Sequence, residues 1–344
     1  MRKQTLKGLA VGLVAVVGLA ACGSSSSSDT TVAAGAAGLA CEVTDTGGVD
    51  DKGFNQIAHE GLLQAESELG VTTDLLESAT DADYAPNLQS FVDKGCNVIV
   101  TVGFLLADAT KAAAEANPNV QFAIVDSNTS APNVQGLTFA TDQPSFLAGY
   151  MAAATTKTGV VGTFGGINIP PVAIFMQGFA KGVEYYNAQK GTSVKVLGWD
   201  IAKQDGTFTG DFQDQTKGTS TAKSMADEGA DIIFPVAGPV GLGASQFAMD
   251  SAGAVKIIGV DVDMSISNPT QAEVYVASVL KKIDAAVLQA VKDALAKTGG
   301  GTDYLGTLEN GGVGVAITST ITPELQAELD AVTAGIIDGS IVTK

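Results

Sequence analysis

The stretch Asp45-Thr46-Gly47-Gly48-Val49-Asp50-Asp51-Lys52-Gly53-Phe54-Asn55-Gln56 organises our interpretation of the chain. It follows a short apolar run at residues 41–44, which predicts a strand, and precedes residues 57–69, where apolar side chains recur at helical spacing. The glycines allow a sharp turn, and Asp50 and Asp51 can cap the helix. In an open parallel sheet, ligands bind past the carboxyl ends of strands. Asp45, Phe54 and Asn55 are therefore candidate binding residues, although an ordinary capped turn has the same pattern.

From residue 41 onward, β-rich runs alternate with amphipathic helical stretches, which is typical of an α/β protein with parallel sheets. We expect strands at residues 41–44, 73–77, 97–102, 121–125 and 136–140, and then at 159–164, 193–197, 231–235 and 256–260. The remaining chain predicts a strand at 273–277, a long helix at 279–296, a final strand pair at 304–308 and 314–317, and a last helix.

The two series of strands resemble each other in sequence. Residues 95–103 match residues 229–238, and residues 120–126 match residues 255–261, in the same order. The repeat predicts two duplicated lobes, although strands share residue preferences and can match by chance. Asp126 and Asp261 end matched strands, so both are expected to face the space between the lobes, unless each only caps its loop.

The length of 344 residues suits two domains. We expect an N-terminal lobe of residues 41–140 plus 264–298 and a C-terminal lobe of residues 141–263 plus 299–344, joined by hinge crossovers. Residues 1–21 have a basic start, an apolar segment and small residues before Cys22, which is typical of a lipoprotein signal peptide; a plain signal peptide or a core helix is the alternative. Residues 22–40 have the composition of a flexible tether.

Two cysteines remain, and both lie next to predicted strands. Cys41 opens the first strand and Cys96 directly precedes the strand at residues 97–102. If those strands are neighbours, both cysteines lie at the same end of the sheet. We therefore predict a disulfide, which an extracytoplasmic location permits; two buried thiols are the alternative.

The sequence contains little that could perform catalysis. His59 is the single histidine and lies within the first predicted helix, where we assign it no role. No CxxC, HExxH or phosphate-binding loop is present, and the aspartates near Asp45 do not have EF-hand spacing. We expect no metal, no cofactor and no enzymatic activity. The net charge of −18 argues against a nucleic-acid partner.

Aromatic residues make up only 6% of the chain, so those in predicted loops stand out. Phe54 lies at the first turn, and Phe208 and Phe212 lie in a polar loop of the second lobe. Two rings from opposite lobes could sandwich a flat ligand, whereas packing beneath the loop is the alternative.

Several segments together resemble the basic membrane lipoprotein family. They include Asp50 to Asn55, Gly165 to Pro170, Phe212-Gln213-Asp214, Ala237-Gly238, Gly259 to Asp263 and Ser278 to Lys281, which span the mature chain in order. The family comprises purine nucleoside receptor-like substrate-binding lipoproteins of ABC importers with the type I periplasmic-binding-protein fold. The resemblance implies two Rossmann-like lobes with parallel sheets and a ligand between them.

The resemblance also implies roles for individual residues. Phe54 and Phe212 match the phenylalanines that stack on the base, and Phe208 is the alternative to Phe212. Asn55 and Asp126 match groups near the base edge. Gly238, Asp261 and Lys281 match groups that hold ribose hydroxyls. Departures at Gly53, at residues 239–240 and at Met264 leave the identity of the ligand open.

We therefore expect a lipid-anchored nucleoside receptor on the extracytoplasmic face of a bacterial cell membrane. Its partners would be the permease and ATPase subunits of an importer, with the membrane contacted through Cys22, and it would act as a monomer. The alternatives are a receptor for a sugar or another small polar solute, and a ligand-sensing lipoprotein that partners a membrane sensor.

Overall fold

The computed structural model describes residues 38–344. The predicted signal peptide, the lipidation site Cys22 and nearly all of the predicted tether lie outside these residues. The first strand, β1, is Leu39–Thr44, so residues 39 and 40 belong to the fold and not to the tether. Within residues 38–344, no helix is both long and apolar enough to cross a membrane.

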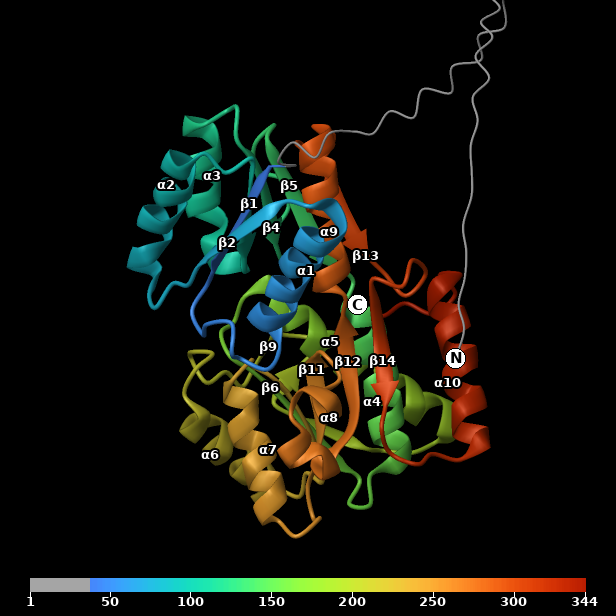
Figure 1. Ribbon diagram of the computed structural model, residues 1–344. Coiled ribbons are helices and arrows are strands. Elements are labelled where there is room, and N and C mark those ends of the chain that lie inside the picture. Colours follow the sequence, from blue (N-terminus) through green and yellow to red (C-terminus); the bar gives the residue numbers. More distant parts are fainter. Residues whose placement is uncertain (1–37) are drawn as a thin grey trace, which may run out of the picture. The chain divides into compact units, whose positions relative to one another are not determined.

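The first sheet is entirely parallel and has the strand order β13-β5-β4-β3-β1-β2 (Figure 1). Its strands are β1, β2 (Thr72–Leu76), β3 (Val98–Val102), β4 (Gln121–Val125), β5 (Val134–Phe139) and β13 (Asp303–Gly306). Its helices are α1 (Phe54–Leu69), α2 (Tyr84–Lys94), α3 (Ala107–Ala116) and α9 (Ile283–Ala296), with short 3-10 turns η1 (Asp81–Asp83) and η2 (Phe104–Leu106).

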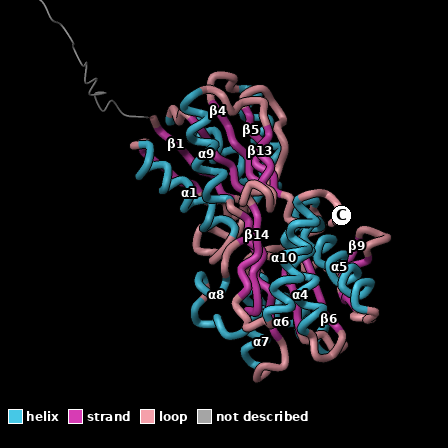
Figure 2. Tube along the Cα trace, turned by 90° about the vertical axis from the view of Figure 1, so that its right-hand side faces the viewer, coloured by secondary structure: helices cyan, strands magenta, loops and turns pink. Residues whose placement is uncertain are grey.

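The second sheet has the order β14-β12-β11-β10-β6-β7, and only the β12–β14 pair is antiparallel. Its strands are β6 (Val160–Gly165), β7 (Lys195–Leu197), β10 (Ile232–Val236), β11 (Lys256–Asp261), β12 (Tyr275–Lys281) and β14 (Val313–Ile317). The accompanying elements are α4 (Asp142–Thr155), α5 (Pro170–Lys190), α6 (Gln215–Asp227), α7 (Val240–Asp250), α8 (Met264–Ser267), η3 (Pro269–Val274), α10 (Pro323–Ile337) and the hairpin β8 (Trp199–Asp200) and β9 (Asp205–Gly206). Figure 2 shows α4 and α10 beside β14, where they share a buried apolar cluster.

The two sheets have corresponding strand orders, and their first five strands also share the parallel direction. Starting from one edge, β2-β1-β3-β4-β5-β13 corresponds to β7-β6-β10-β11-β12-β14. The matched sequences at residues 95–103 and 229–238 therefore surround equivalent strands, β3 and β10. The duplication predicted from the sequence is present in the first five strands of each sheet, whereas the sixth strands differ, because β13 is parallel to β5 and β14 is antiparallel to β12.

The C-terminal third of the chain divides between the sheets differently from our expectation. Residues 264–281 were expected with the first lobe, but β12 pairs with β11 in the second sheet. The expected final strand pair does not form, because β13 pairs with β5 and β14 pairs with β12. Both strands extend sheets whose edge groups would otherwise be unpaired. The chain consequently crosses between the sheets three times, after β5, after β12 and after β13.

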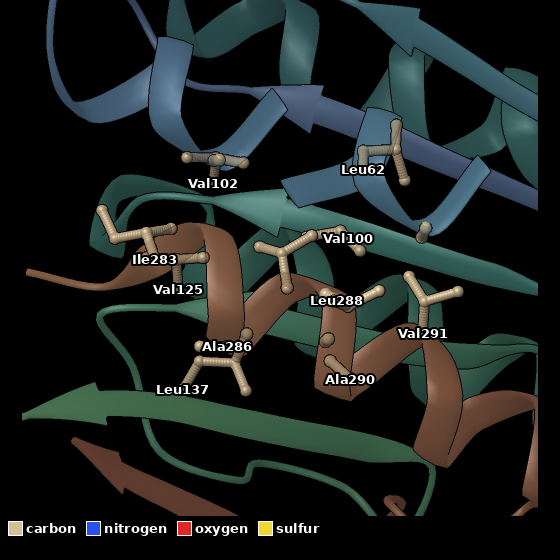
Figure 3. Close-up of a cluster of buried hydrophobic side chains, with 14 of the residues drawn as sticks. Leu62, Val100, Val102, Val125, Leu137, Ile283, Ala286, Leu288, Ala290 and Val291 are labelled. Atoms are coloured by element: carbon tan, nitrogen blue, oxygen red, sulfur yellow. The ribbon is translucent and has the colours of Figure 1, made fainter. Parts of the chain in front are cut away.

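The core of the first lobe shows why far-separated segments come together. Alternate residues of its strands place Val100, Val125 and Leu137 on the face covered by α1 and α9, although these helices lie more than 200 residues apart in sequence (Figures 1 and 3). Gly61 lets α1 pack closely against α9, because a Cβ at this position would lie 2.5 Å from the backbone oxygen of Asp284. The opposite face packs against α2 and α3.

Cys41 and Cys96 form a disulfide, as the sequence predicted. Cys41 lies in β1, and Cys96 follows α2 and precedes β3, which is the neighbour of β1. The bond therefore joins the first strand to the adjacent connection at one end of the sheet.

Candidate functional site

A cavity with about 610 Å³ of empty space, part of it open to solvent, lies where the carboxyl ends of both sheets meet. Six of the residues singled out from the sequence line it, together with two from the family resemblance: Asp45, Phe54, Asn55, Asp126, Phe212 and Asp261, and then Gly238 and Lys281. Phe208 does not line it.

The opening stretch forms the first-lobe wall of this cavity. The Asp51 carboxylate accepts backbone N–H groups from Gly53, Asn55 and Gln56 at 2.8–3.1 Å, which caps the start of α1. This cap holds Phe54 and Asn55 in the first turn of the helix. The side-chain Oδ1 of Asn55 is buried and has no hydrogen-bond partner among the described residues. A buried acceptor of this kind is suited to a ligand N–H or O–H group.

Asp126 and Asp261 occupy equivalent positions in the two lobes. Asp126 directly follows β4, and Asp261 is the last residue of β11. Both adopt a left-handed backbone conformation, with φ of 68° and 66°. This conformation is uncommon for residues other than glycine and is often found at functional sites. Both residues line the cavity at the carboxyl ends of their strands.

Lys281 joins the two lobes inside the cavity. It ends β12 of the second sheet, and its Nζ lies 2.6 Å from Asp126 Oδ2 of the first lobe. The side chains are 2% and 11% exposed, respectively, so the ion pair is largely buried. The same ammonium lies 4.7 Å from the centre of the Phe54 ring, which is a favourable cation–π distance.

The cavity is rich in carboxylates. Asp45, Asp51, Asp126 and Asp261 line it, and Lys281 is the only basic side chain among the lining residues. Burial raises the pKa of Asp261 to about 7, and Lys281 only partly offsets this effect. Burial also raises the pKa of Asp45 well above its usual value. A cavity with this charge balance favours neutral ligands and hydrogen-bond donors over anions.

The structure separates the two candidate phenylalanines of the second-lobe loop. Phe212 lines the cavity and lies against Gly166, where a Cβ would come within 2.3 Å of the ring. Phe208 instead packs edge-on against Trp199, with ring centres 6.4 Å apart, and against Gly165. Phe208 is therefore a packing residue beneath the loop.

Several lining residues were not singled out as site residues from the sequence. Phe104 follows β3 at the same sheet edge as Asp126, so its position past the carboxyl end of a strand was an available signal. Phe175 and Val172 come from α5, and no local pattern distinguishes them from core residues of that helix. Together they make the second-lobe wall apolar.

Among residues 38–344, no group of three or more histidine, cysteine, aspartate or glutamate side chains is arranged to hold a metal ion. The cavity itself contains neither cysteine nor histidine. The groups present can accept and donate hydrogen bonds and can stack on a planar ligand.

The family model of PnrA-like ABC transporter substrate-binding proteins matches residues 39–344. The chain belongs to this family. The match covers both sheets, all three crossings and every lining residue of the cavity, so the chain is an ABC transporter substrate-binding protein by family.

Individual relatives support the assignment over nearly the whole chain. The ABC transporter nucleoside-binding protein BmpA of Lactococcus lactis subsp. cremoris is 33% identical, with 99% of each chain covered. Basic membrane protein A1 of Borrelia garinii subsp. bavariensis is 32% identical, covering 86% of this chain and 85% of its own. The crystal structure of an ABC transporter solute-binding protein from Aeropyrum pernix K1 has a TM-score of 0.77 and 26% identity, and covers 89% of this chain and 93% of its own.

The solved substrate-binding protein confirms the type I periplasmic-binding fold expected for this family member. In this fold, solute capture requires a cavity between two lobes that can move about their connecting segments. The substrate-binding protein described here has that cavity at the carboxyl ends of two parallel sheets.

Proposed function

We propose that this protein captures a purine nucleoside between its two lobes and delivers it to the permease of an ABC importer. The observation that carries the proposal is that Phe54 and Phe212, from opposite lobes, line one cavity whose polar groups are mainly acceptors. Aromatic rings stack on a base with about 1–3 kcal/mol per contact. A relative named as nucleoside-binding, 33% identical over 359 residues, supports the same ligand class.

The polar groups suit the two halves of a nucleoside. The free acceptor of Asn55 and the carboxylate of Asp126 would meet donors on the base edge. Asp261, Lys281 and the backbone near Gly238 would meet ribose hydroxyls, because a carboxylate can accept two hydroxyl hydrogen bonds. Gly238 has φ of 52°, and the absence of a side chain there lets the sugar approach the backbone.

The charge balance of the cavity predicts selection against phosphorylated ligands. Four carboxylates line the cavity and the single lysine already pairs with Asp126. A phosphate would add charge of the same sign in a partly desolvated space. We expect inosine to bind and inosine monophosphate to fail.

The experiment is a thermal-shift and calorimetric titration of the purified protein with inosine, adenosine, guanosine, uridine, ribose, arabinose and glucose. A purine nucleoside should raise the unfolding temperature, and Phe54→Ala should abolish the shift because one stacking face is lost. A response to a free pentose or hexose, with none to any nucleoside, would refute the nucleoside assignment and leave the family assignment intact.

We further propose that Cys22 carries the lipid that anchors the protein at the outer face of the membrane. The support is the sequence Leu19-Ala20-Ala21-Cys22 after a basic and apolar start. Radiolabelled palmitate should enter the wild-type protein in cells, and Cys22→Ser should release the chain into the soluble fraction. Labelling that persists in Cys22→Ser would place the lipid elsewhere.

A further inference from the structure

A buried carboxylate on β1 has no hydrogen bond within the part of the chain that the structure describes. Glu42, in the middle of β1, is 0% exposed, and neither of its carboxylate oxygens has a hydrogen-bond partner among the described residues. Among residues 38–344, the only basic group within ion-pair distance of Glu42 is His59 of α1, whose Nδ1 lies 3.8 Å from Glu42 Oε2. That distance is too long for a hydrogen bond but allows strong electrostatic interaction at a dry site.

The surroundings favour a proton on this pair. Burial raises the pKa of Glu42, and His59 only partly offsets the effect. The nearby Glu42 carboxylate is the main cause that raises the pKa of His59 above its ordinary value of 6.5. An isolated ionised carboxylate in an apolar interior is costly, so the charged pair or the neutral pair is preferred over a lone anion.

From residue 38 onward, no other charged group around the pair offers a positive charge that could neutralise Glu42 in place of this proton. Glu60 on α1 and Glu77 after β2 are both acidic and add to the rise in the pKa of His59. On α9, which packs along α1, Lys292 is paired with Glu68. The same helix places Asp284 against Gly61.

The pair connects the two elements that form the first-lobe wall of the cavity. Glu42 lies on β1, three residues before Asp45, which directly follows the strand, and His59 follows Asn55 by one helical turn on α1. Figure 1 shows β1 leading into the loop from which α1 starts. A change in the separation of Glu42 and His59 therefore changes the position of Asn55 relative to Asp45.

We propose that Glu42 and His59 share one proton and act as a positioning pair, which holds the corner between β1 and α1 in its binding geometry and loosens it when the proton is lost. The proposal concerns the geometry of the first lobe and applies to any solute that occupies the cavity. It is therefore independent of the nucleoside assignment.

The direction of the pH effect follows from the folded state holding more protons than the unfolded chain. Glu42 and His59 both have raised pKa values when folded. The stability that they contribute is fully present below their ordinary pKa values and is lost as the pH rises through the raised values. The corner should loosen on the alkaline side of about pH 6.5.

Because His59 is the single histidine, tag-free protein gives one imidazole signal in an NMR titration. We expect this signal to titrate above pH 6.5 and the backbone amides of Phe54 and Asn55 to shift with the same midpoint. In Glu42→Gln, the midpoint should fall toward about 6.5, and the amides should no longer follow it. Glu60→Gln is the matched control, since it removes an acidic neighbour on the same helix that does not contact the buried strand, and it should change the midpoint far less.

Two results would overturn the proposal. One is a His59 midpoint at or below 6.5 in the wild-type protein, which needs no variant and so does not depend on whether Glu42→Gln folds. The other is a pH-dependent shift of the Asn55 amide that survives in His59→Gln, because the shift would then come from another group. If the pair had only a structural role, the chemical shift of the Asn55 amide would not change with pH at the midpoint of the His59 titration.

Discussion

Replacing Lys281 by methionine tests the electrostatic organisation of the cavity. Methionine keeps much of the length of the lysine side chain and removes its charge. The substitution leaves the Asp126 carboxylate, which is 11% exposed, without its partner, and it also removes the cation nearest to Asp261. The structure therefore predicts a loss of stability and not a local rearrangement of surface charge.

The magnitude follows from the geometry of the pair. At 2.6 Å and an effective dielectric constant of about 20, the attraction between the charges is about 6 kcal/mol. Much of this offsets the desolvation of the two groups, and removal of one partner of a buried pair usually costs about 3–5 kcal/mol. For a chain of this size, each kcal/mol corresponds to about 2 °C in the unfolding temperature. We expect Lys281→Met to lower that temperature by about 6–10 °C.

Urea denaturation followed by circular dichroism measures the change in unfolding free energy, and a double-mutant cycle isolates the pair. Asp126→Asn combined with Lys281→Met should be more stable than Lys281→Met alone, because no unpaired carboxylate remains at Asp126. Lys111→Met is the control, since Lys111 forms an exposed pair with Glu115 on α3, and its effect should stay below about 0.5 kcal/mol. Two results would contradict a stabilising role for the buried pair. One is a loss of unfolding free energy in Lys281→Met no larger than that in Lys111→Met, and the other is a double variant no more stable than Lys281→Met.

Three further predictions follow from the same structure. Phe212→Ala should weaken nucleoside binding about 10–100-fold in calorimetry, since it removes one stacking ring, whereas Phe208→Ala should lower the unfolding temperature and leave affinity within about threefold. The folded pKa of Asp261 is raised to about 7, so its contribution to the unfolding free energy is lost as the pH rises from about 4 through 7. The unfolding free energy of Asp261→Asn should therefore depend less on pH over that interval than that of the wild type. Equal slopes for the two proteins would contradict the raised pKa. Reduction of the Cys41–Cys96 bond, which links positions 55 residues apart, should cost about 4 kcal/mol by the chain-entropy relation, and an unchanged unfolding temperature in dithiothreitol would refute this.

Local sequence patterns were sufficient for most strands and for several of the residues that line the cavity. Apolar periodicity located the strands to within a few residues, because side-chain burial on a sheet is encoded by neighbouring residues. The internal repeat pairs Asp126 with Asp261 from the sequence alone, and the structure gives both residues the same left-handed backbone conformation. Phe54 and Asn55 followed from the turn between β1 and α1. The helix cap and the position past the carboxyl end of a strand are both features of the local sequence.

The family resemblance supplied what local patterns could not. Lys281 and Gly238 have no distinguishing neighbours in the sequence, and they entered only because they matched family motifs. The structure shows why the local sequence does not identify Lys281 as a site residue. Lys281 ends a strand whose apolar sequence indicates only burial, and its side chain reaches across to Asp126 of the other lobe.

The sequence by itself determined the parallel α/β architecture, its duplication and the positions of the residues that follow each strand, because these depend on contacts between near neighbours. Only the tertiary structure decided that β12 joins the second sheet and β13 the first, that Phe212 and not Phe208 reaches the cavity, and that Glu42 meets His59. Each of these depends on which distant segments compete for the same sheet edge or the same buried volume. That competition is settled by packing and hydrogen bonding over the whole fold, and no local period encodes its outcome.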